Sequence, residues 1–363
     1  MFRQASTTYL SAGGVLKMSR RLRVAVIGVG GWGINHVRVL SRLTKTYDIE
    51  VIVVDTLRER ARQVAEKYGV KSYYADYLEA YRKEKYDAAI VAVPTKLHYH
   101  VARDLIDKAD LLIEKPLATT IRDAAEIVKM AERNNRIVAV GHIERFNPAV
   151  IAAKKEIESR VKEDPVLAIY AERIGIRPTN VEKYLGVALD LMVHDIDVVC
   201  YLLNELPESV QALKYPPKGF EDDALAVFSF ENKNAILHAS RRARMKRRSL
   251  RIQTLYTLIE VDYMLQHIKI IEGIHPSTTP PDYFKILEAY QSSKMVEKRL
   301  LRGAETEPLF LEDKHFVEAV IEGKRPLVSA VEGYISVKCA LKAIEAAERE
   351  IRIHLKWDED FLG

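Results

Sequence analysis

The sequence predicts an α/β protein: an N-terminal domain with a doubly wound parallel sheet, then a C-terminal α+β domain with a large open, mainly antiparallel sheet. Between residues 22 and 140, short runs rich in β-branched residues alternate with amphipathic helical segments, a pattern typical of a parallel sheet covered by helices. After Gly141, strand-like runs follow one another across short turns, which is typical of an antiparallel sheet.

The first domain is expected to hold six strands and four helices. Its strands are predicted at Leu22–Ile27, Glu50–Val54, Lys71–Tyr74, Ala88–Val93, Leu111–Ile113 and Ile137–Val140. Its helices, in which apolar residues recur every three or four positions, are predicted at Gly33–Leu43, Leu57–Lys67, His98–Ile106 and Ile121–Asn134.

The second domain is expected to combine four helices with a run of strands. The helices are predicted at Pro148–Val161, Val187–Leu203, Phe310–Ile321 and Val331–Arg349. The strands are predicted at Val166–Glu172, Val210–Lys214, Ala224–Phe230, Ala235–Ser240, Leu250–Leu255, Leu258–Tyr263, His267–Ile271 and Ile351–Leu355. The proline-containing segment His275–Asp282 is expected to be a loop. We therefore predict an N-terminal extension at 1–20, disordered, and domains at 21–142 and 143–363.

Composition limits the classes of function. The 363 residues carry 56 Lys and Arg against 51 Asp and Glu, and a net charge of +5 does not by itself imply a nucleic-acid partner. The sequence contains no run of eighteen uncharged apolar residues, so no membrane-spanning helix is predicted. Cys200 and Cys339 cannot make a disulfide framework, which favours a reducing compartment. We expect a cytoplasmic protein with no membrane or nucleic-acid partner.

A glycine-rich turn follows the first predicted strand and opens the first predicted helix. Its residues run Gly28-Val-Gly30-Gly31-Trp32-Gly33, a G-x-G-x-x-G pattern. The first glycine permits the tight turn, the second admits a pyrophosphate against bare backbone, and the third allows close packing of helix on strand. This context predicts a Rossmann dinucleotide-binding domain rather than a bare turn.

An acidic residue after the second predicted strand indicates which dinucleotide binds. Asp55 lies about 20 residues beyond the third glycine, where a carboxylate accepts hydrogen bonds from ribose hydroxyls and repels a 2′-phosphate. NAD is therefore expected as the cofactor, with NADP disfavoured. Arg58 and Arg60 would instead favour NADP, because guanidinium groups bind phosphate.

Four motifs in order carry a family resemblance. They are the glycine turn, Pro94-Thr-Lys-Leu-His98, Glu114-Lys115-Pro116, and Asp190-Leu-Met-Val-His194-Asp-Ile-Asp197. With these motifs the chain resembles the Gfo/Idh/MocA oxidoreductases over nearly everything after Met18. Three further stretches, Gly141–Pro148, Leu189–Asp197 and Glu307–Phe316, are similar to the UDP-N-acetylglucosamine 3-dehydrogenase branch, which oxidises the sugar C3 hydroxyl to a ketone.

The resemblance implies a catalytic group of three residues. His194 would be the base that removes the hydroxyl proton, Lys115 would hydrogen-bond the reacting oxygen, and Asp190 would contact substrate or stabilise the imidazolium. In a regular helix Asp190, His194 and Asp197 would share one face. A structural helix pair, or half of a metal site, is the alternative for Asp190 and His194; with no cysteine ligand pair and a lysine already supplying positive charge, we expect no metal.

The resemblance also extends to cofactor and substrate contacts. Pro94, Thr95 and His98 would lie near the cofactor, with Gly31, Trp32 and Glu114 beside it, whereas His100 matches no motif. Arg145 and Asn147 would contact the sugar or serve as a structural hinge, and Arg173 would face the substrate.

A basic run and the open sheet leave further alternatives. The run Arg241–Arg248 is expected to be a solvated hairpin or subunit contact, with two other readings: one arginine reaching the UDP pyrophosphate, or nucleic-acid binding. The uncovered sheet face predicts a homodimer or homotetramer. The substrate could instead be another sugar or an inositol-type polyol, and a non-catalytic NAD-binding regulator is the alternative of another class.

Overall fold

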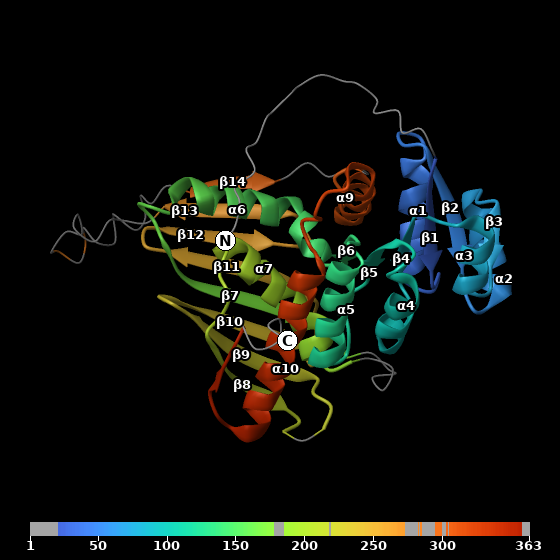
Figure 1. The fold of residues 1–363 in the computed structure, drawn as a ribbon. Coiled ribbons are helices and arrows are strands. Elements are labelled where there is room, and N and C mark those ends of the chain that lie inside the picture. The colour runs from blue at the N-terminus through green and yellow to red at the C-terminus, as the bar shows by residue number, and fades with distance from the viewer. Residues whose placement is uncertain are drawn as a thin grey trace.

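The structure is a computed structural model that describes residues 21–177, 185–217, 219–272, 282, 284, 295–299, 303 and 305–357. It contains two sheets, drawn on opposite sides of Figure 1, with α5 and α10 between them. The predicted extension at 1–20, and all of the predicted loop at His275–Asp282 except its last residue, lie outside the described residues.

The first sheet is six-stranded and parallel, in the order β3-β2-β1-β4-β5-β6. This order is that of a doubly wound dinucleotide-binding fold, in which ligands bind at the carboxyl ends of the strands near the β1/β4 switch. The strands are β1 (Leu22–Ile27), β2 (Ile49–Val54), β3 (Ser72–Tyr74), β4 (Ala88–Val91), β5 (Asp110–Ile113) and β6 (Val138–Val140). Their nearly continuous burial is what helices on both faces produce.

Five helices cover this sheet, one more than predicted. They are α1 (Gly33–Leu43), α2 (Arg58–Tyr68), α3 (Tyr77–Glu84), α4 (His98–Leu105) and α5 (Ile121–Arg133). The unpredicted helix is α3, which buries one residue, Ala80, and so carries little apolar periodicity. Its cap was visible in the sequence: the side chain of Asp76 accepts a hydrogen bond from the Glu79 backbone at 2.6 Å.

The second sheet has nine strands in the order β14-β13-β12-β11-β7-β10-β9-β8-β15. All neighbouring pairs are antiparallel except β7 with β10. The strands are β7 (Val166–Ile174), β8 (Ser209–Tyr215), β9 (Asp223–Phe230), β10 (Lys233–Ser240), β11 (Arg247–Thr254), β12 (Thr257–Asp262), β13 (His267–Glu272), β14 (Met295–Arg299) and β15 (Ile353–His354). The sequence did not predict β14, nor the parallel pairing of β7 with β10.

Three helices cover one face of the nine-stranded sheet: α6 (Pro148–Arg160), α7 (Val193–Leu203) and α10 (Ala330–Arg349). Where one continuous helix was predicted from Val187, a π-helical turn at Ala188–Met192 precedes α7. Such widened turns are rare and often occur at functional sites. Asp190 lies in the π turn and His194 in the first turn of α7.

The last two helices connect the two halves. Helix α9 (Pro308–Glu322) packs against α1, where Phe316 and Val317 share one apolar core with Val37 and Leu40. The first half of α10 packs against α5, and its second half packs against the nine-stranded sheet. The 142/143 boundary therefore stays a prediction, with part of the C-terminal segment buried against the first sheet.

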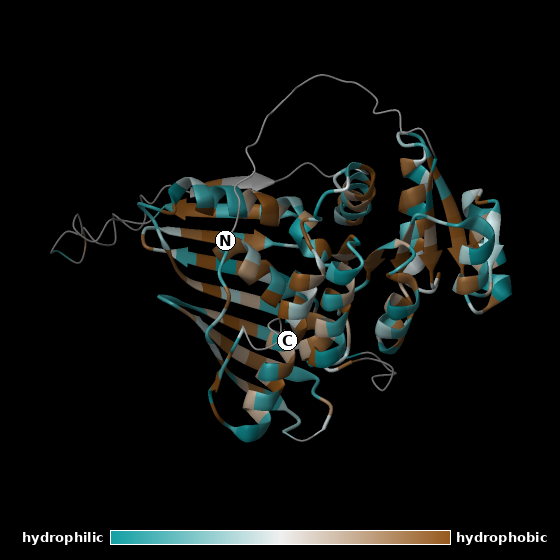
Figure 2. Cartoon of the chain, viewed as in Figure 1, coloured by the Kyte–Doolittle hydropathy of each residue, from teal (hydrophilic) through white to brown (hydrophobic). Residues whose placement is uncertain are grey.

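Apolar residues follow the strands of both sheets, and hydrophilic residues occupy the outward sides of the helices (Figure 2). In the described part of the chain no helix is both long and apolar enough to cross a bilayer.

Candidate active site

The glycine turn leaves bare backbone at the carboxyl end of β1. Gly28 has φ +85°, and a Cβ there would lie 2.8 Å from the carbonyl oxygen of Ala92. At Gly33 a Cβ would lie 1.8 Å from the oxygen of Gly28, so α1 could not begin so close to the turn with any other residue. Gly30 and Gly31 have no neighbouring atom within 4 Å of that position. The turn therefore fits a pyrophosphate, as the dinucleotide prediction requires.

Asp55, directly after β2, is tied to this turn. Its carboxylate accepts hydrogen bonds from the backbone of Val29 at 3.0 Å and of Leu57 at 2.9 Å. Arg60 pairs with it bidentately, at 2.9 and 2.7 Å. Asp55, the buried residue expected to bind a ribose, is thus already paired with the partly exposed Arg60. Both side chains therefore affect the choice between NAD and NADP.

Glu114, just after β5, joins the glycine turn to Lys115. One carboxylate oxygen accepts from Trp32 Nε1 at 2.6 Å and from His36 Nε2 at 3.0 Å, and the other accepts from the backbone N–H of Lys115 at 3.1 Å. A Cβ on Gly141 would lie 3.0 Å from this carboxylate. Glu114 is a positioning residue whose oxygens are engaged by the protein itself.

His36, which the sequence analysis missed, bridges two carboxylates. Its Nδ1 lies 2.8 Å from Asp313 on α9 and its Nε2 lies 3.0 Å from Glu114. Burial opposes a charge here, yet Asp313 and Glu114 hold the pKa of His36 well above its ordinary value. An imidazolium donating to both therefore ties α9 to the edge that carries Lys115. The motif around Asp313 had carried the resemblance, but nothing in the sequence linked it to His36.

Lys115 reaches across to the second domain. Its ammonium lies 3.0 Å from Oδ1 of Asp190 and donates to the Asp190 carbonyl at 2.7 Å. Arg241 pairs with the other carboxylate oxygen of Asp190 at 2.5 Å. Burial opposes ionisation of Asp190, but Lys115 and Arg241 hold its pKa below its ordinary value. The Lys115–Pro116 peptide bond is cis. The Asp190 carboxylate thus pairs with two cations, Lys115 and Arg241. The sequence had led us to expect that it would contact substrate or stabilise the imidazolium of His194.

His194 lies in the first turn of α7, close to a second histidine. Burial, reinforced by the charges of Lys115 and Arg173, holds the pKa of His194 well below its ordinary value. The ring of His142, which follows β6, lies 6.4 Å away between centroids. Burial also lowers the pKa of His142, and among the described residues neither of its ring nitrogens has a hydrogen-bond partner. The lowered pKa keeps His194 neutral at neutral pH, the state in which an imidazole can accept a proton. The sequence did not single out His142 as a residue of this region.

His98 braces the turn after β5. Its two ring nitrogens lie 2.9 Å from the carbonyl oxygen of Pro116 and 3.0 Å from that of Val93. It is buried, whereas Pro94 is exposed and Thr95 half-buried at the turn that leads into α4. The structure thus places His98 behind the site as a support for the segment that carries Lys115.

Arg145, expected to contact the sugar or act as a structural hinge, is engaged by other residues of the chain. It is buried and donates bidentately to Asp197 at 2.8 and 2.7 Å and to the carbonyl of Leu327 at 3.2 Å. Its guanidinium also stacks on Tyr201. Arg145 and Asp197 are both buried, and charges removed from water must be paired, as these two are with each other.

Arg173 and Asn147 are likewise engaged by other residues of the chain. Arg173 is buried, with a bidentate pair to Asp195 at 2.9 Å and a further bond to Glu144 at 2.9 Å, so two carboxylates of the chain already engage its guanidinium, and a contact with substrate stays a prediction. Asn147 caps α6, accepting from the backbone of Ala149 and donating to Glu144 and to a backbone carbonyl. Both hydrogens of its amide group are donated within the protein, and its oxygen accepts a bond as well.

The basic run connects β10 to β11, and three of its arginines have partners from other parts of the chain. Besides Arg241, which binds Asp190, Arg242 stacks on Tyr215 at 3.9 Å and Arg247 pairs with Glu172 at 3.2 Å. The expected hairpin is wrong, because β7 lies between β10 and β11 in the sheet and the run therefore connects two strands that are not paired with each other.

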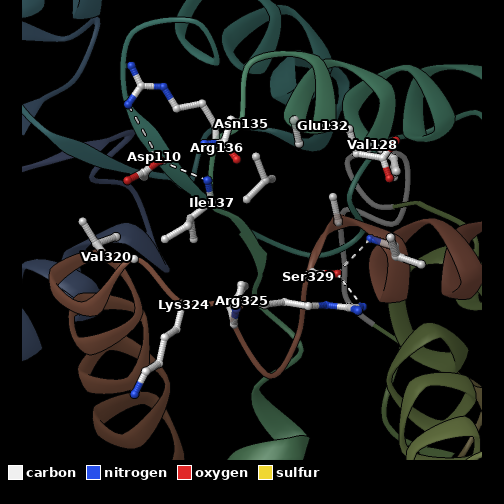
Figure 3. A pocket seen from close by; sticks show the side chains of 16 residues that line it. Asp110, Val128, Glu132, Asn135, Arg136, Ile137, Val320, Lys324, Arg325 and Ser329 are labelled. Atoms are coloured by element: carbon white, nitrogen blue, oxygen red, sulfur yellow. Dashed lines mark hydrogen bonds and ion pairs between the residues drawn. The ribbon is translucent and has the colours of Figure 1, made fainter. Parts of the chain in front are cut away.

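One depression lies away from these residues. It has a volume of about 520 Å³ and is lined by Asp110, Arg136, Ile137, Arg325 and Ser329 (Figure 3). Because Asp110 starts β5 and Ile137 precedes β6, this depression lies at the amino ends of strands whose carboxyl ends carry the site. The described residues include no group of three His, Cys, Asp or Glu side chains placed to hold a metal ion.

A dinucleotide turn at a switch point, with a lysine from one half paired to an aspartate of the other one helical turn before a buried histidine, defines the class: a nicotinamide-dependent oxidoreductase. Residues 22–142 match the family model described as "Oxidoreductase family, NAD-binding Rossmann fold", and residues 175–255 match "GFO/IDH/MocA C-terminal domain". The two matches together cover more than half of the chain, which belongs to the Gfo/Idh/MocA family of NAD-binding oxidoreductases.

Named relatives are dehydrogenases of sugars and polyols. The chain is 25% identical to scyllo-inositol 2-dehydrogenase (NAD(+)) of Bacillus subtilis, over 95% of this chain and 100% of that protein. It is 31% identical to inositol 2-dehydrogenase of Mycolicibacterium smegmatis, over 57% of this chain and 61% of that protein.

Solved structures share the fold. UDP-N-acetylglucosamine 3-dehydrogenase of Acidithiobacillus ferrooxidans superimposes with a TM-score of 0.76 at 23% identity, covering 91% of this chain and 99% of that chain. Levoglucosan dehydrogenase in complex with NADH and levoglucosan gives 0.80 at 18% identity, covering 93% and 100%.

Proposed function

We propose that this enzyme oxidises the C3 hydroxyl of UDP-N-acetylglucosamine to the 3-keto sugar, with NAD as hydride acceptor. The observation that carries the oxidation chemistry is the contact of Lys115 with Asp190 one helical turn from His194. The sugar is supported by the motifs at Gly141–Pro148 and Glu307–Phe316, and by the likeness of fold to an enzyme of that name.

The chain's own residues supply the proton chemistry. NAD, when bound, takes the hydride from the carbinol carbon. Neutral His194 accepts the hydroxyl proton, and the ammonium of Lys115 donates a hydrogen bond to the oxygen as negative charge develops on it. Asp190 holds that ammonium in place, and Glu114 fixes the backbone from which it extends.

NAD is proposed over NADP because Asp55 is a buried carboxylate at the ribose position. Its pair with Arg60 leaves one cation near that position, already neutralised. A 2′-phosphate would have to compete with Asp55 for this arginine.

Oxidation of an inositol-type polyol is the second candidate, favoured by the names of the curated relatives. The test is NADH formation, followed by absorbance, with UDP-N-acetylglucosamine, free N-acetylglucosamine, scyllo-inositol and myo-inositol. We expect turnover with the nucleotide sugar. Turnover with inositols alone would move the assignment to the second candidate, and none with any sugar would leave a non-catalytic NAD-binding protein.

A homo-oligomer formed through the nine-stranded sheet, in the cytoplasm, completes the proposal. The sheet face opposite the helices exposes Tyr170 and Leu225. Both cysteines are free thiols, one of them buried, as suits a reducing compartment. Light scattering of the purified protein tests the assembly: a monomer at micromolar concentration would contradict it.

A further inference from the structure

Arg248 lies beside Arg173 at the end of the sheet nearest the catalytic histidine. The two residues are directly opposite each other in the antiparallel pair of β11 with β7. Leu250 and Ile252, two and four positions along β11, are buried under the helices, so Arg248 belongs to the same face. Arg247 belongs to the other face, where it pairs with Glu172.

The two arginines differ in how their charge is balanced. Arg173 has the carboxylates of Asp195 and Glu144. Arg248 is half-buried and has no hydrogen-bond or ion-pair partner for its guanidinium in the described part of the chain. Like charges on directly opposed residues destabilise a sheet, and a half-buried cation without a partner adds to that cost.

The surroundings of Arg248 reinforce this positive charge. Burial and the charge of Arg173 lower the pKa of Arg248, and the charge of Arg248 in turn lowers the pKa of Lys246. Lys246, an exposed residue just before β11, adds positive charge near Arg248. Arg173, directly opposite Arg248, pairs with Asp195, which is the residue after His194. Arg248 therefore lies near the proposed base, and its charge contributes to the low pKa of His194, where burial is the largest cause.

We propose that Arg248, assisted by Lys246, binds the diphosphate of the nucleotide sugar and thereby selects an anionic substrate over a neutral polyol. This inference rests on the proposed function and assigns it a substrate-binding group. A guanidinium donates two parallel hydrogen bonds to a phosphate, and the ligand's negative charge replaces the partner that Arg248 lacks. A neutral inositol offers no such charge.

The test compares two neighbouring substitutions, Arg248→Met and Arg247→Gln. Each removes one positive charge from β11, but only the first removes the inward-facing guanidinium. Binding of UDP, of uridine and of NAD to each full-length protein is measured by calorimetry, and KM for UDP-N-acetylglucosamine by absorbance. Arg248→Met should weaken UDP binding and raise KM by about 10- to 100-fold, the size expected for a charged hydrogen bond, with NAD binding unchanged. Arg247→Gln should leave all of these unchanged.

The outcomes separate this inference from the proposed function. Wild-type protein that binds UDP more tightly than uridine, with the difference lost in Arg248→Met, supports the anion site whether or not the sugar is oxidised. Wild-type turnover of UDP-N-acetylglucosamine with equal KM in both variants overturns the role of Arg248 and leaves the proposed function intact. Equal affinity of the wild type for UDP and uridine overturns the diphosphate site directly.

Discussion

The ammonium of Lys115 lies 3.0 Å from the carboxylate of Asp190, although the two residues are 75 positions apart in the chain. Lys115 follows the fifth strand of the parallel sheet, and Asp190 lies in the π turn at the start of the helix that covers the other sheet. This contact joins the two halves of the molecule within one helical turn of His194.

Replacing Lys115 by methionine should lower kcat by about 100- to 10,000-fold while leaving NAD affinity unchanged. The substitution removes the hydrogen bond to the developing alkoxide, and Asp190 keeps its pair with Arg241. Steady-state kinetics and NAD titration are the measurements. Lys108→Met, on the exposed turn before β5, is the matched control and should behave as wild type. Full kcat in Lys115→Met would remove the lysine from the mechanism.

The pH profile of kcat/KM should stay flat from neutral pH to below the ordinary histidine pKa. Burial first, and then the positive charges of Lys115 and Arg173, depress the pKa of His194, so the base is lost only at lower pH. In Lys115→Met the same limb should move to higher pH, because one of those charges is gone. A wild-type limb above pH 6.5, or no movement in the variant, would contradict this assignment of the base.

Asp55→Ala should shift cofactor use from NAD toward NADP. The substitution removes the ribose acceptor and frees Arg60 to bind a 2′-phosphate. We expect the ratio of kcat/KM for NAD to that for NADP to fall by about 100-fold, a loss of about 2.7 kcal/mol of discrimination. The double variant Asp55→Ala, Arg60→Ala should use NADP poorly. Unchanged preference in the single variant would show that another group selects the cofactor.

Glu312→Gln should stabilise the protein increasingly as pH rises. Burial, with Glu114 and Asp313 nearby, raises the pKa of Glu312 well above its ordinary value. The folded state therefore keeps a proton that the unfolded chain releases above about pH 4.3, and this costs stability between that pH and the folded pKa.

Urea unfolding at pH 5 and pH 8 measures the effect. The amide cannot ionise, so the gain over wild type should be small at pH 5 and reach about 1 to 3 kcal/mol at pH 8. The control Glu322→Gln, at the end of the same helix, should change stability equally at both pH values. A gain from Glu312→Gln that shrinks with pH would show that the acid is ionised in the fold.

Local patterns predicted most elements of the fold. The strand at Leu22–Ile27 and the helix at Gly33–Leu43 occur where expected. Both are predicted by signals that residues close together in the chain provide, namely the glycine turn and the apolar periodicity. Helix α3 was missed because it buries a single residue. Strand β14 and the parallel pairing of β7 with β10 depend on partners distant in the chain, which a local pattern does not contain.

The same division applies to the site. The sequence by itself determined the family motifs, the dinucleotide turn and the identity of Lys115, Asp190 and His194, since each motif is a short stretch with its own backbone requirements. Only the tertiary structure decided that Arg145 and Arg173 are buried in ion pairs, whereas the guanidinium of Arg248 has no hydrogen-bond or ion-pair partner among the residues that the structure describes. These three arginines look alike in sequence. Their roles depend on which carboxylates the folded chain brings within 4 Å of them, and on how much water it leaves around them.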